Sequence, residues 1–207
     1  DAETREIEAY AQKTEGKDFK LQPYDRFYYS AKMKKEMLNI SDDEIKPYFN
    51  VDSVQMNGVF YAAHRVYGLN FKQRKDIPTY HPDMKVFEVS DKNGKPIALF
   101  YSDKWGQLPI IYNVCNNDKA PEGQPTLITW DEVCTMFHEF GHALHGILSK
   151  CSYNTLSGTA VARDFVEMPS QFNESFASIP EIFDHYARHT ETGAPMPADL
   201  KERMLKS

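Results

Sequence analysis

The chain has 207 residues and a formal net charge of −6, with 41% hydrophobic and 13% aromatic residues. These values are typical of a globular domain, or part of one, with enough apolar side chains for a core. The acidic balance argues against nucleic acid or an anionic membrane as a partner, because both attract basic patches. The apolar runs are shorter than the roughly 20 residues that cross a bilayer, and the first residues lack the pattern of a signal peptide.

The cysteine pattern indicates the cellular compartment in which the protein is expected. Cys115, Cys134 and Cys151 form neither a CxxC pair nor an even set, so we expect reduced thiols that bind no metal. Together with the missing signal pattern, this predicts a cytoplasmic protein. The chain starts without Met and both ends lie inside helical patterns, so we expect a fragment of a longer protein.

Helical patterns dominate the first third of the sequence. Charged, helix-prone spacing predicts helices over residues 1–14 and 24–38, and Ser41 followed by Glu44 is a helix-start signal. Residues 51–67 have apolar side chains at helical spacing, and Gly68 is expected to end that helix.

After Gly68 the spacing of apolar residues changes from a helical to a β-strand pattern. The stretch "MKVFEVSDKNGKPIALFY", residues 84–101, contains two short β-prone runs joined by Asp91-Lys92-Asn93-Gly94, which favours a hairpin over two unrelated strands. A polar loop is expected over 116–126, and the helical period then returns. The sequence therefore predicts a mainly α fold with a small β-sheet.

The segment "FHEFGHALHGIL", residues 137–148, lies on one of the predicted helices. Thr129 is the expected N-cap, with Glu132 completing a capping box. A buried face is predicted at i, i+3, i+4 and i+7 spacing: Val133, Met136, Phe137, Phe140, Leu144, Ile147 and Leu148.

His138 and His142 lie on a different stripe of this helix. Because they are four residues apart, their side chains stack one turn above the other and can converge on one metal ion, as in H-E-x-x-H zinc sites. Glu139 is rotated by about 100° from His138, which suits a base at the edge of the site better than a ligand. Gly141 leaves the helix surface bare beside the motif, at a cost of roughly 1 kcal/mol relative to Ala. The alternative is a helix whose His and Glu side chains are solvated or satisfied inside a core.

A third ligand is needed, and the pattern HExxHxxGxxH does not supply it, because His145 and Leu148 occupy its Gly and third His positions. The second source is the segment "RDFVEMPSQFNESFA", residues 163–177, expected to form a helix starting near Asp164. From the residues alone, Glu167 and Glu174 are both admissible ligands. Asp164 shares a face with Glu167 and is a candidate hydrogen-bond partner of a ligand histidine.

These segments resemble a known family. "FHEFGHALHG", "SGT", "RDFVEMPSQ" and "YARH" are similar to the thimet-oligopeptidase-like (M3) zinc peptidases. The segments "GVFYAAHRVYGLNF", "DIPTYHPDMKVFEV" and "PTLITWDEVCTMFHEFGHALHG" most resemble its bacterial peptidyl-dipeptidase (dipeptidyl carboxypeptidase) branch. The resemblance extends through nearly the whole chain in order.

The resemblance implies one Zn²⁺ per chain, held by His138, His142 and Glu167, with Glu139 as general base and acid acting on a zinc-activated water. It implies a zincin-type catalytic core of a larger helical peptidase and hydrolysis of short, unstructured peptides, with release of C-terminal dipeptides. Alternatives are an endo-oligopeptidase of the same family or a non-catalytic zinc-binding domain.

Residues 1–207 are expected to form a single partial catalytic domain with its metal-site portion at 127–180. Two parts of the family pattern are expected to be absent. One is a Gly-Gly substrate strand after Asp103, and the other comprises the N-terminal channel region and the C-terminal substrate-binding part. We therefore expect the isolated 207-residue chain to have little or no peptidase activity.

Overall fold

The computed structural model describes residues 2–38, 41–79, 84–102, 111–113, 120–121, 123–151 and 157–206. The chain divides into two compact units, one formed by Asp1–Ile45 with Pro197–Ser207 and the other by Lys46–Met196. None of the described helices is both long and apolar enough to span a membrane. The single partial domain over 1–207 stays a prediction. Residues 103–110, Cys115 and residues 116–119 and 122 of the expected loop at 116–126 lie outside the described residues.

The first unit is helical. It contains α1 (Ala2–Glu15), α2 (Arg26–Leu38), α3 (Asp42–Ile45) and α9 (Ala198–Leu205). Its buried cluster consists of Ile7, Ala11 and Tyr29, which join the first two helices. The helices expected over 1–14 and 24–38 are confirmed to within two residues at each end, and the short α3 begins directly after Ser41.

In the second unit, a helical segment leads into the sheet. It runs through η1 (Lys46–Tyr48), α4 (Val51–Ser53), the π-helical turn η2 (Val54–Val59) and α5 (Phe60–Tyr67). Asn50 caps the start of α4, since the Asn50 side-chain oxygen accepts hydrogen bonds from the Asp52 and Ser53 amides. Gly68 ends it at φ +69, as predicted. No sequence pattern indicated the π-helical turn, which places Gly58 against the ring of Tyr186.

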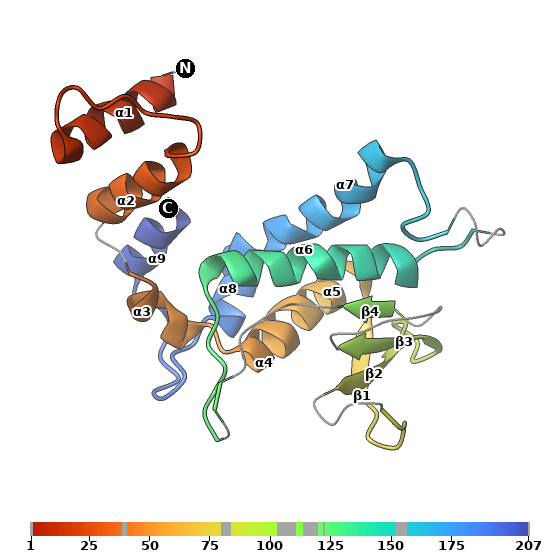
Figure 1. The fold of residues 1–207 in the computed structure, drawn as a ribbon. Helices are drawn as coiled ribbons and strands as arrows, with labels where there is room; N and C mark the ends of the chain where they lie inside the picture. The colour runs from red at the N-terminus through yellow and green to blue at the C-terminus, as the bar shows by residue number, and fades with distance from the viewer. Residues whose placement is uncertain are drawn as a thin grey trace. The chain divides into compact units, whose positions relative to one another are not determined.

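A four-stranded sheet lies near one end of α6 (Figure 1). Strands β1 (Asn70–Gln73), β2 (Lys85–Ser90) and β3 (Pro96–Ser102) are antiparallel neighbours, and β4 (Ile111–Asn113) runs parallel to β3. The predicted hairpin is confirmed by the pairing of β2 with β3. Asp91 closes its turn by accepting hydrogen bonds from the Asn93 and Lys95 amides.

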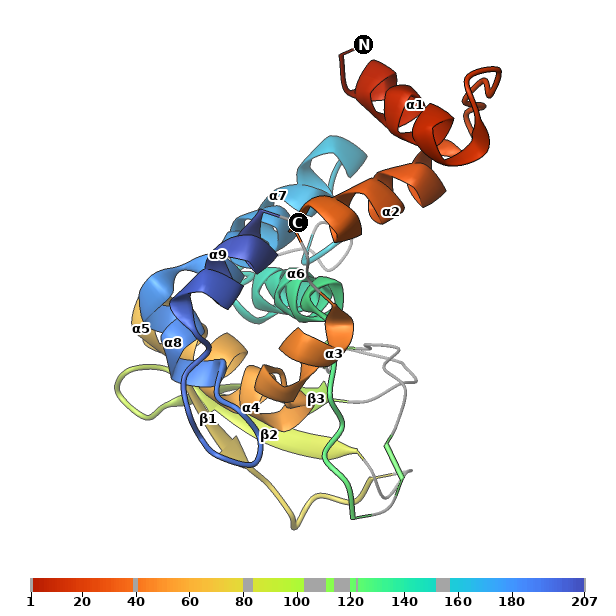
Figure 2. The same ribbon diagram turned by 90° about the vertical axis from the view of Figure 1, so that its left-hand side faces the viewer.

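Two long helices follow the sheet and carry the motif. They are α6 (Trp130–Ile147) and α7 (Arg163–Glu174), followed by η4 (Ser175–Ser178) and α8 (Pro180–Tyr186). Figure 1 and Figure 2 both show α7 running alongside α6. The fold is therefore mainly α with a small sheet, as expected from the sequence.

The predicted capping box of α6 is confirmed. The Glu132 amide donates to the Thr129 hydroxyl at 3.2 Å, and the Thr129 amide donates to the Glu132 carboxylate at 2.7 Å. Both bonds satisfy amide groups that would otherwise have no partner in the first turn. The start of the motif helix is thereby fixed by its own sequence.

The buried face of α6 packs on a cluster of phenylalanines. Phe140 contacts the rings of Phe60 from α5, Phe71 from β1 and Phe100 from β3, with ring centroids 5.3–5.9 Å apart. Six of the seven positions predicted for this face are buried. Leu148 differs, with 40% of its surface exposed, because α6 ends at Ile147 and Leu148 lies at the edge of a pocket.

Candidate metal centre

The two motif histidines lie on the part of α6 that faces α7. Their rings are 5.1 Å apart between centroids, one helical turn from each other. The side chains are 25% (His138) and 21% (His142) exposed. This stripe is therefore partly open to solvent, whereas the phenylalanine face of the same helix is closed.

A carboxylate from α7 meets both rings. Glu167 Oε2 lies 3.1 Å from His138 Nε2 and 3.2 Å from His142 Nε2. One donor atom from each of the three side chains lies within 4.8 Å of the other two. The structure thus brings His138, His142 and Glu167 together from two helices, although Glu167 follows His142 by 25 residues in the sequence.

These donors fit a zinc ion. Ligands that bind one zinc ion at about 2.0–2.2 Å lie roughly 3–3.5 Å from each other, which matches the two nitrogen–oxygen separations. Two imidazole nitrogens and one carboxylate oxygen are also a donor set of catalytic zinc sites, which keep a further position open. The partial exposure of all three side chains agrees with an open site.

The hydroxyl of Ser170 contacts the carboxylate of Glu167. Ser170 is fully buried and its Oγ lies 2.8 Å from Glu167 Oε2. This hydrogen bond is the largest cause that lowers the pKa of Glu167; burial opposes it, and the charges of His142 and His138 add to it. The carboxylate is therefore held in its ionised form, which is the form that binds metal.

The other nitrogen of His138 is also occupied. His138 Nδ1 lies 3.0 Å from Glu174 Oε2, which fixes the ring and leaves Nε2 for the metal position. Asp164, which the sequence suggested for such a contact, is exposed in the first turn of α7 and has no hydrogen bond to a histidine in the described part of the chain. Its role stays a prediction, and the observed contact belongs to Glu174.

Nδ1 of His142 differs from Nδ1 of His138. It is buried and has no hydrogen-bond partner among the residues that the structure describes. Buried polar atoms are nearly always paired in native proteins. Among the described residues the two imidazoles therefore differ, since Nδ1 of His138 meets a carboxylate and Nδ1 of His142 meets no hydrogen-bond partner.

Glu139 remains available for proton transfer. It lies one residue after His138 on α6 and is partly buried, and no hydrogen bond or ion pair joins it to another described residue. A carboxylate that is tied to a neighbour would be a poorer base. The role of Glu139 as a base at the edge of the metal site stays a prediction.

Cys134 lies one turn before His138 on the same stripe of α6. Burial, with smaller contributions from the charges of Glu174 and Asp131, raises the pKa of its thiol to about 12. The thiol is therefore protonated at neutral pH. That the cysteines bind no metal stays a prediction.

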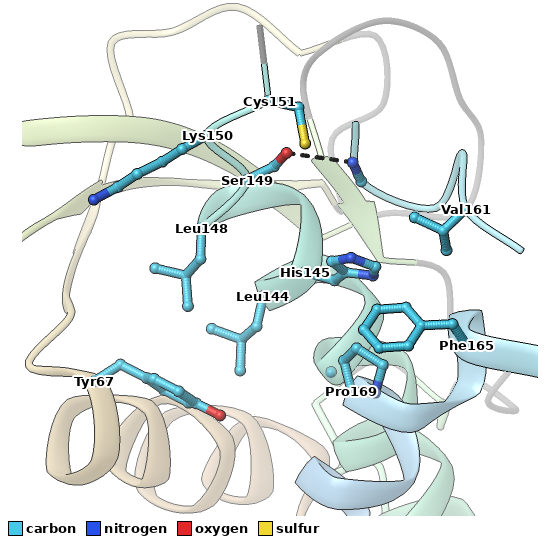
Figure 3. A pocket seen from close by; sticks show the side chains of 12 residues that line it. Tyr67, Leu144, His145, Leu148, Ser149, Lys150, Cys151, Val161, Phe165 and Pro169 are labelled. Carbon is cyan, nitrogen blue, oxygen red and sulfur yellow. Dashed lines mark hydrogen bonds between the residues drawn. The ribbon is translucent and has the colours of Figure 1, made fainter. Parts of the chain in front are cut away.

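His145 is not part of the donor group. Its ring packs on Phe165 of α7 with centroids 6.0 Å apart, and its Nδ1 is buried without a partner among the described residues. It lines a pocket of about 380 Å³. Figure 3 shows it there near Leu144 of α6, Leu148 just after the end of α6, and Phe165 and Pro169 of α7. Its exclusion from the ligand set agrees with the failure of the HExxHxxGxxH pattern.

The second motif helix begins where the sequence predicted but has an unexpected interior. It starts at Arg163, next to Asp164, while Pro169 lies within the helix and not near its start. Proline has no amide hydrogen and interrupts the helical hydrogen bonding at this point. Its carbonyl oxygen would lie 2.7 Å from a Cβ atom on Gly141 of α6, so the two helices are in tight contact at this point.

A mainly α fold with a small sheet, and an HExxH helix facing a carboxylate on a second helix, is the arrangement of the zincin-type metallopeptidases. A sequence profile of peptidase family M3 matches residues 1–106 and 104–207 of the chain. The chain therefore belongs to peptidase family M3.

Two groups of relatives are found within the family. The chain is 43% identical over 210 residues to the dipeptidyl carboxypeptidase of Salmonella typhimurium, covering 91% of this chain and 31% of that protein. It is 42% identical over 223 residues to the dipeptidyl carboxypeptidase of Escherichia coli, covering 98% and 33%. Oligopeptidase A of Escherichia coli is 37% identical over 228 residues, again covering 98% and 33%. The chain thus spans about a third of the length of these curated relatives.

Proposed function

We propose that this chain holds one zinc ion through His138, His142 and Glu167 and forms the metal-site portion of a peptidase. The observation that carries the proposal is the convergence of His138 Nε2, His142 Nε2 and Glu167 Oε2, with the two nitrogen–oxygen distances at 3.1 and 3.2 Å. Membership of peptidase family M3 supports it independently.

The division of labour follows from the residues. When bound, zinc would supply Lewis-acid polarisation of a peptide carbonyl and lower the pKa of a coordinated water. His138, His142 and Glu167 hold the ion, and Glu174 keeps the His138 ring in the orientation that presents Nε2. Glu139 accepts the proton that the attacking water loses and passes it to the leaving amine.

The proposed reaction is hydrolysis of short, unstructured peptides, with release of dipeptides from a free C-terminus. Support comes from the two relatives named dipeptidyl carboxypeptidase, which are 42–43% identical to the chain. Endopeptidase cleavage is the second candidate, because oligopeptidase A is 37% identical and matches 98% of the chain. The cytoplasmic location remains a prediction.

A chimera tests the activity, since the chain spans a third of its relatives. This chain replaces the matching third of the Escherichia coli dipeptidyl carboxypeptidase, and the zinc content and folding of the product are measured before any assay. A peptide with a free C-terminus should lose dipeptides, whereas its C-terminally amidated twin should not. Internal cleavage of both peptides would favour the endopeptidase, and a folded, zinc-loaded chimera without hydrolysis would contradict the proposed function.

Glu139→Gln separates a catalytic site from a metal site that is only structural. The substitution preserves shape and removes the proton acceptor, so hydrolysis by the chimera should be abolished while zinc stoichiometry stays near one. Unchanged hydrolysis would assign the base to another residue.

A further inference from the structure

At Gly141, α6 packs tightly against α7. A Cβ atom at this position would lie 2.5 Å from Ser170 Cα, 2.7 Å from the Pro169 carbonyl oxygen and 2.9 Å from Asn173 Cβ. Two of these atoms belong to the α7 backbone, which cannot rotate aside as a side chain does. Any residue larger than glycine would therefore push α7 away from α6.

Ser170 connects this contact to the metal ligand. Its Cα is the atom nearest to Gly141, while its buried Oγ lies 2.8 Å from Glu167 Oε2 and 2.9 Å from the Glu167 carbonyl oxygen. Glu167 Oε2 is the same atom that faces Nε2 of both histidines. The position of the ligand oxygen is thus tied to the depth at which α7 lies on α6.

Asn173 holds the two helices at this spacing. Its side-chain amide donates to the Phe137 carbonyl oxygen at 2.6 Å, and Asn173 is only 2% exposed. Figure 3 shows Pro169, the residue before Ser170, lying against α6 below His145. This tight contact at Gly141 therefore lies within one helical turn of the two ligand histidines.

We propose that Gly141 and Ser170 are a positioning pair for the third metal ligand. Gly141 sets how closely α7 approaches, and the Ser170 hydroxyl aims the Glu167 carboxylate at the two imidazoles. Neither residue belongs to the donor group of His138, His142 and Glu167. The inference rests on the proposed metal site and assigns two residues that act through Glu167.

Ser170→Ala in the 207-residue chain is the first test, with zinc affinity measured by competition against a chromophoric chelator. The affinity should fall about 10–100-fold, the range seen when a group that orients a metal ligand is removed. Ser175→Ala is the matched control. The Ser175 hydroxyl also donates to the carbonyl oxygen three residues earlier, that of Phe172 at 2.6 Å, and it has no hydrogen bond to a carboxylate among the described residues. The control should leave zinc affinity unchanged, so equal affinities for the two variants would overturn the proposal.

Gly141→Ala is compared with Gly58→Ala. A Cβ on Gly58 would lie 2.9 Å from Tyr186 Cδ1 and 3.2 Å from Phe137 Cζ, so that variant also crowds the core of this unit, away from α7. Both variants should unfold at lower temperature, and only Gly141→Ala should bind zinc more weakly. Equal zinc affinity in two folded variants would contradict the proposal, and if Gly141→Ala does not fold, the Ser170 comparison decides alone.

A double variant shows whether Ser170 acts through Glu167. In the Glu167→Ala background, adding Ser170→Ala should not weaken zinc binding any further, whereas a general effect on the fold would lower the affinity in both backgrounds. The two proposals fail differently. A wild-type chain that binds no zinc removes the proposed function, while tight zinc binding that is insensitive to Ser170→Ala removes only the positioning pair.

Discussion

The two faces of α6 are built from one stretch of sequence but are maintained in different ways. On one face, Phe137 and Phe140 are buried among aromatic rings from α5, α8 and the sheet. On the other, His138 and His142 are partly exposed and meet a single carboxylate from α7. The apolar face is determined by many contacts of the same kind, whereas the polar face depends on a few atoms.

Because the two faces of α6 differ in this way, the apolar face determines mainly stability and the polar face mainly metal binding. Apolar contacts are non-directional, and each ring of the cluster touches several others, so the face as a whole defines where α6 lies. A metal site requires donor atoms at specific distances, so a small displacement of α7 affects it much more. Substitutions on the two faces should therefore have effects that are nearly independent of each other.

The largest effect on stability is expected for Phe140→Ala. Phe140 is 1% exposed and contacts three other rings, so the substitution leaves a cavity and should lower the free energy of unfolding by about 3–5 kcal/mol. Urea unfolding of the metal-free chain measures the loss. Phe172→Ala is the matched control, because Phe172 is 53% exposed on α7, and it should cost less than about 1 kcal/mol.

The two faces of α6 would not be independent if folded Phe140→Ala bound zinc as weakly as a variant that lacks one of the three metal ligands. We expect its zinc affinity, measured at a temperature where it is folded, to stay close to that of the wild type.

Glu174→Ala should have an intermediate effect, and this effect concerns zinc affinity at the histidine face of α6. Loss of the carboxylate at His138 Nδ1 frees the ring to rotate, so zinc affinity should fall about 10–100-fold, or roughly 1.4–2.8 kcal/mol. Metal competition titration measures this loss. Asp164→Ala is the natural comparison, because the sequence suggested Asp164 for the same role. Weaker binding after Asp164→Ala, with Glu174→Ala unchanged, would reverse the assignment.

The smallest of these effects is expected at the start of α6. Thr129→Ala removes both the hydroxyl that accepts from the Glu132 amide and the capping box, and should cost about 1 kcal/mol of unfolding free energy. Thr135→Ala is the control on the same helix, because Thr135 only bonds the Asp131 carbonyl and is exposed. Alanine is the better helix former there, so the control should be neutral or slightly stabilising. An equal loss in both variants would show that the cap does not contribute.

Much of this architecture could be predicted from local sequence patterns. The cap at Thr129, the stop at Gly68 and the hairpin turn at Asp91 each depend on hydrogen bonds or backbone angles within a few residues. The apolar period of α6 also assigned its buried face, except at Leu148, where the helix has already ended.

The rest depends on how α7 lies on α6, which no local pattern specifies. Spacing alone left Glu167 and Glu174 as equal candidates for the third ligand, and family resemblance chose between them. The geometry gives both a position, because two helical turns separate them on one face: Glu167 reaches the Nε2 atoms and Glu174 reaches Nδ1 of His138. The spacing of Glu167, Ser170 and Glu174 could have indicated that Ser170 shares a helix face with the two carboxylates. The role of Ser170 becomes visible only in the structure, where it packs against Gly141 and bonds Glu167.

Zinc titration of the wild-type chain beside Glu167→Ala tests the central claim most directly. The account predicts one tightly bound zinc per wild-type chain and an affinity lower by more than about 100-fold in Glu167→Ala, beyond the range for residues that only orient ligands. A folded wild-type chain that takes up no zinc, or a Glu167→Ala variant that binds it as tightly, would contradict the account.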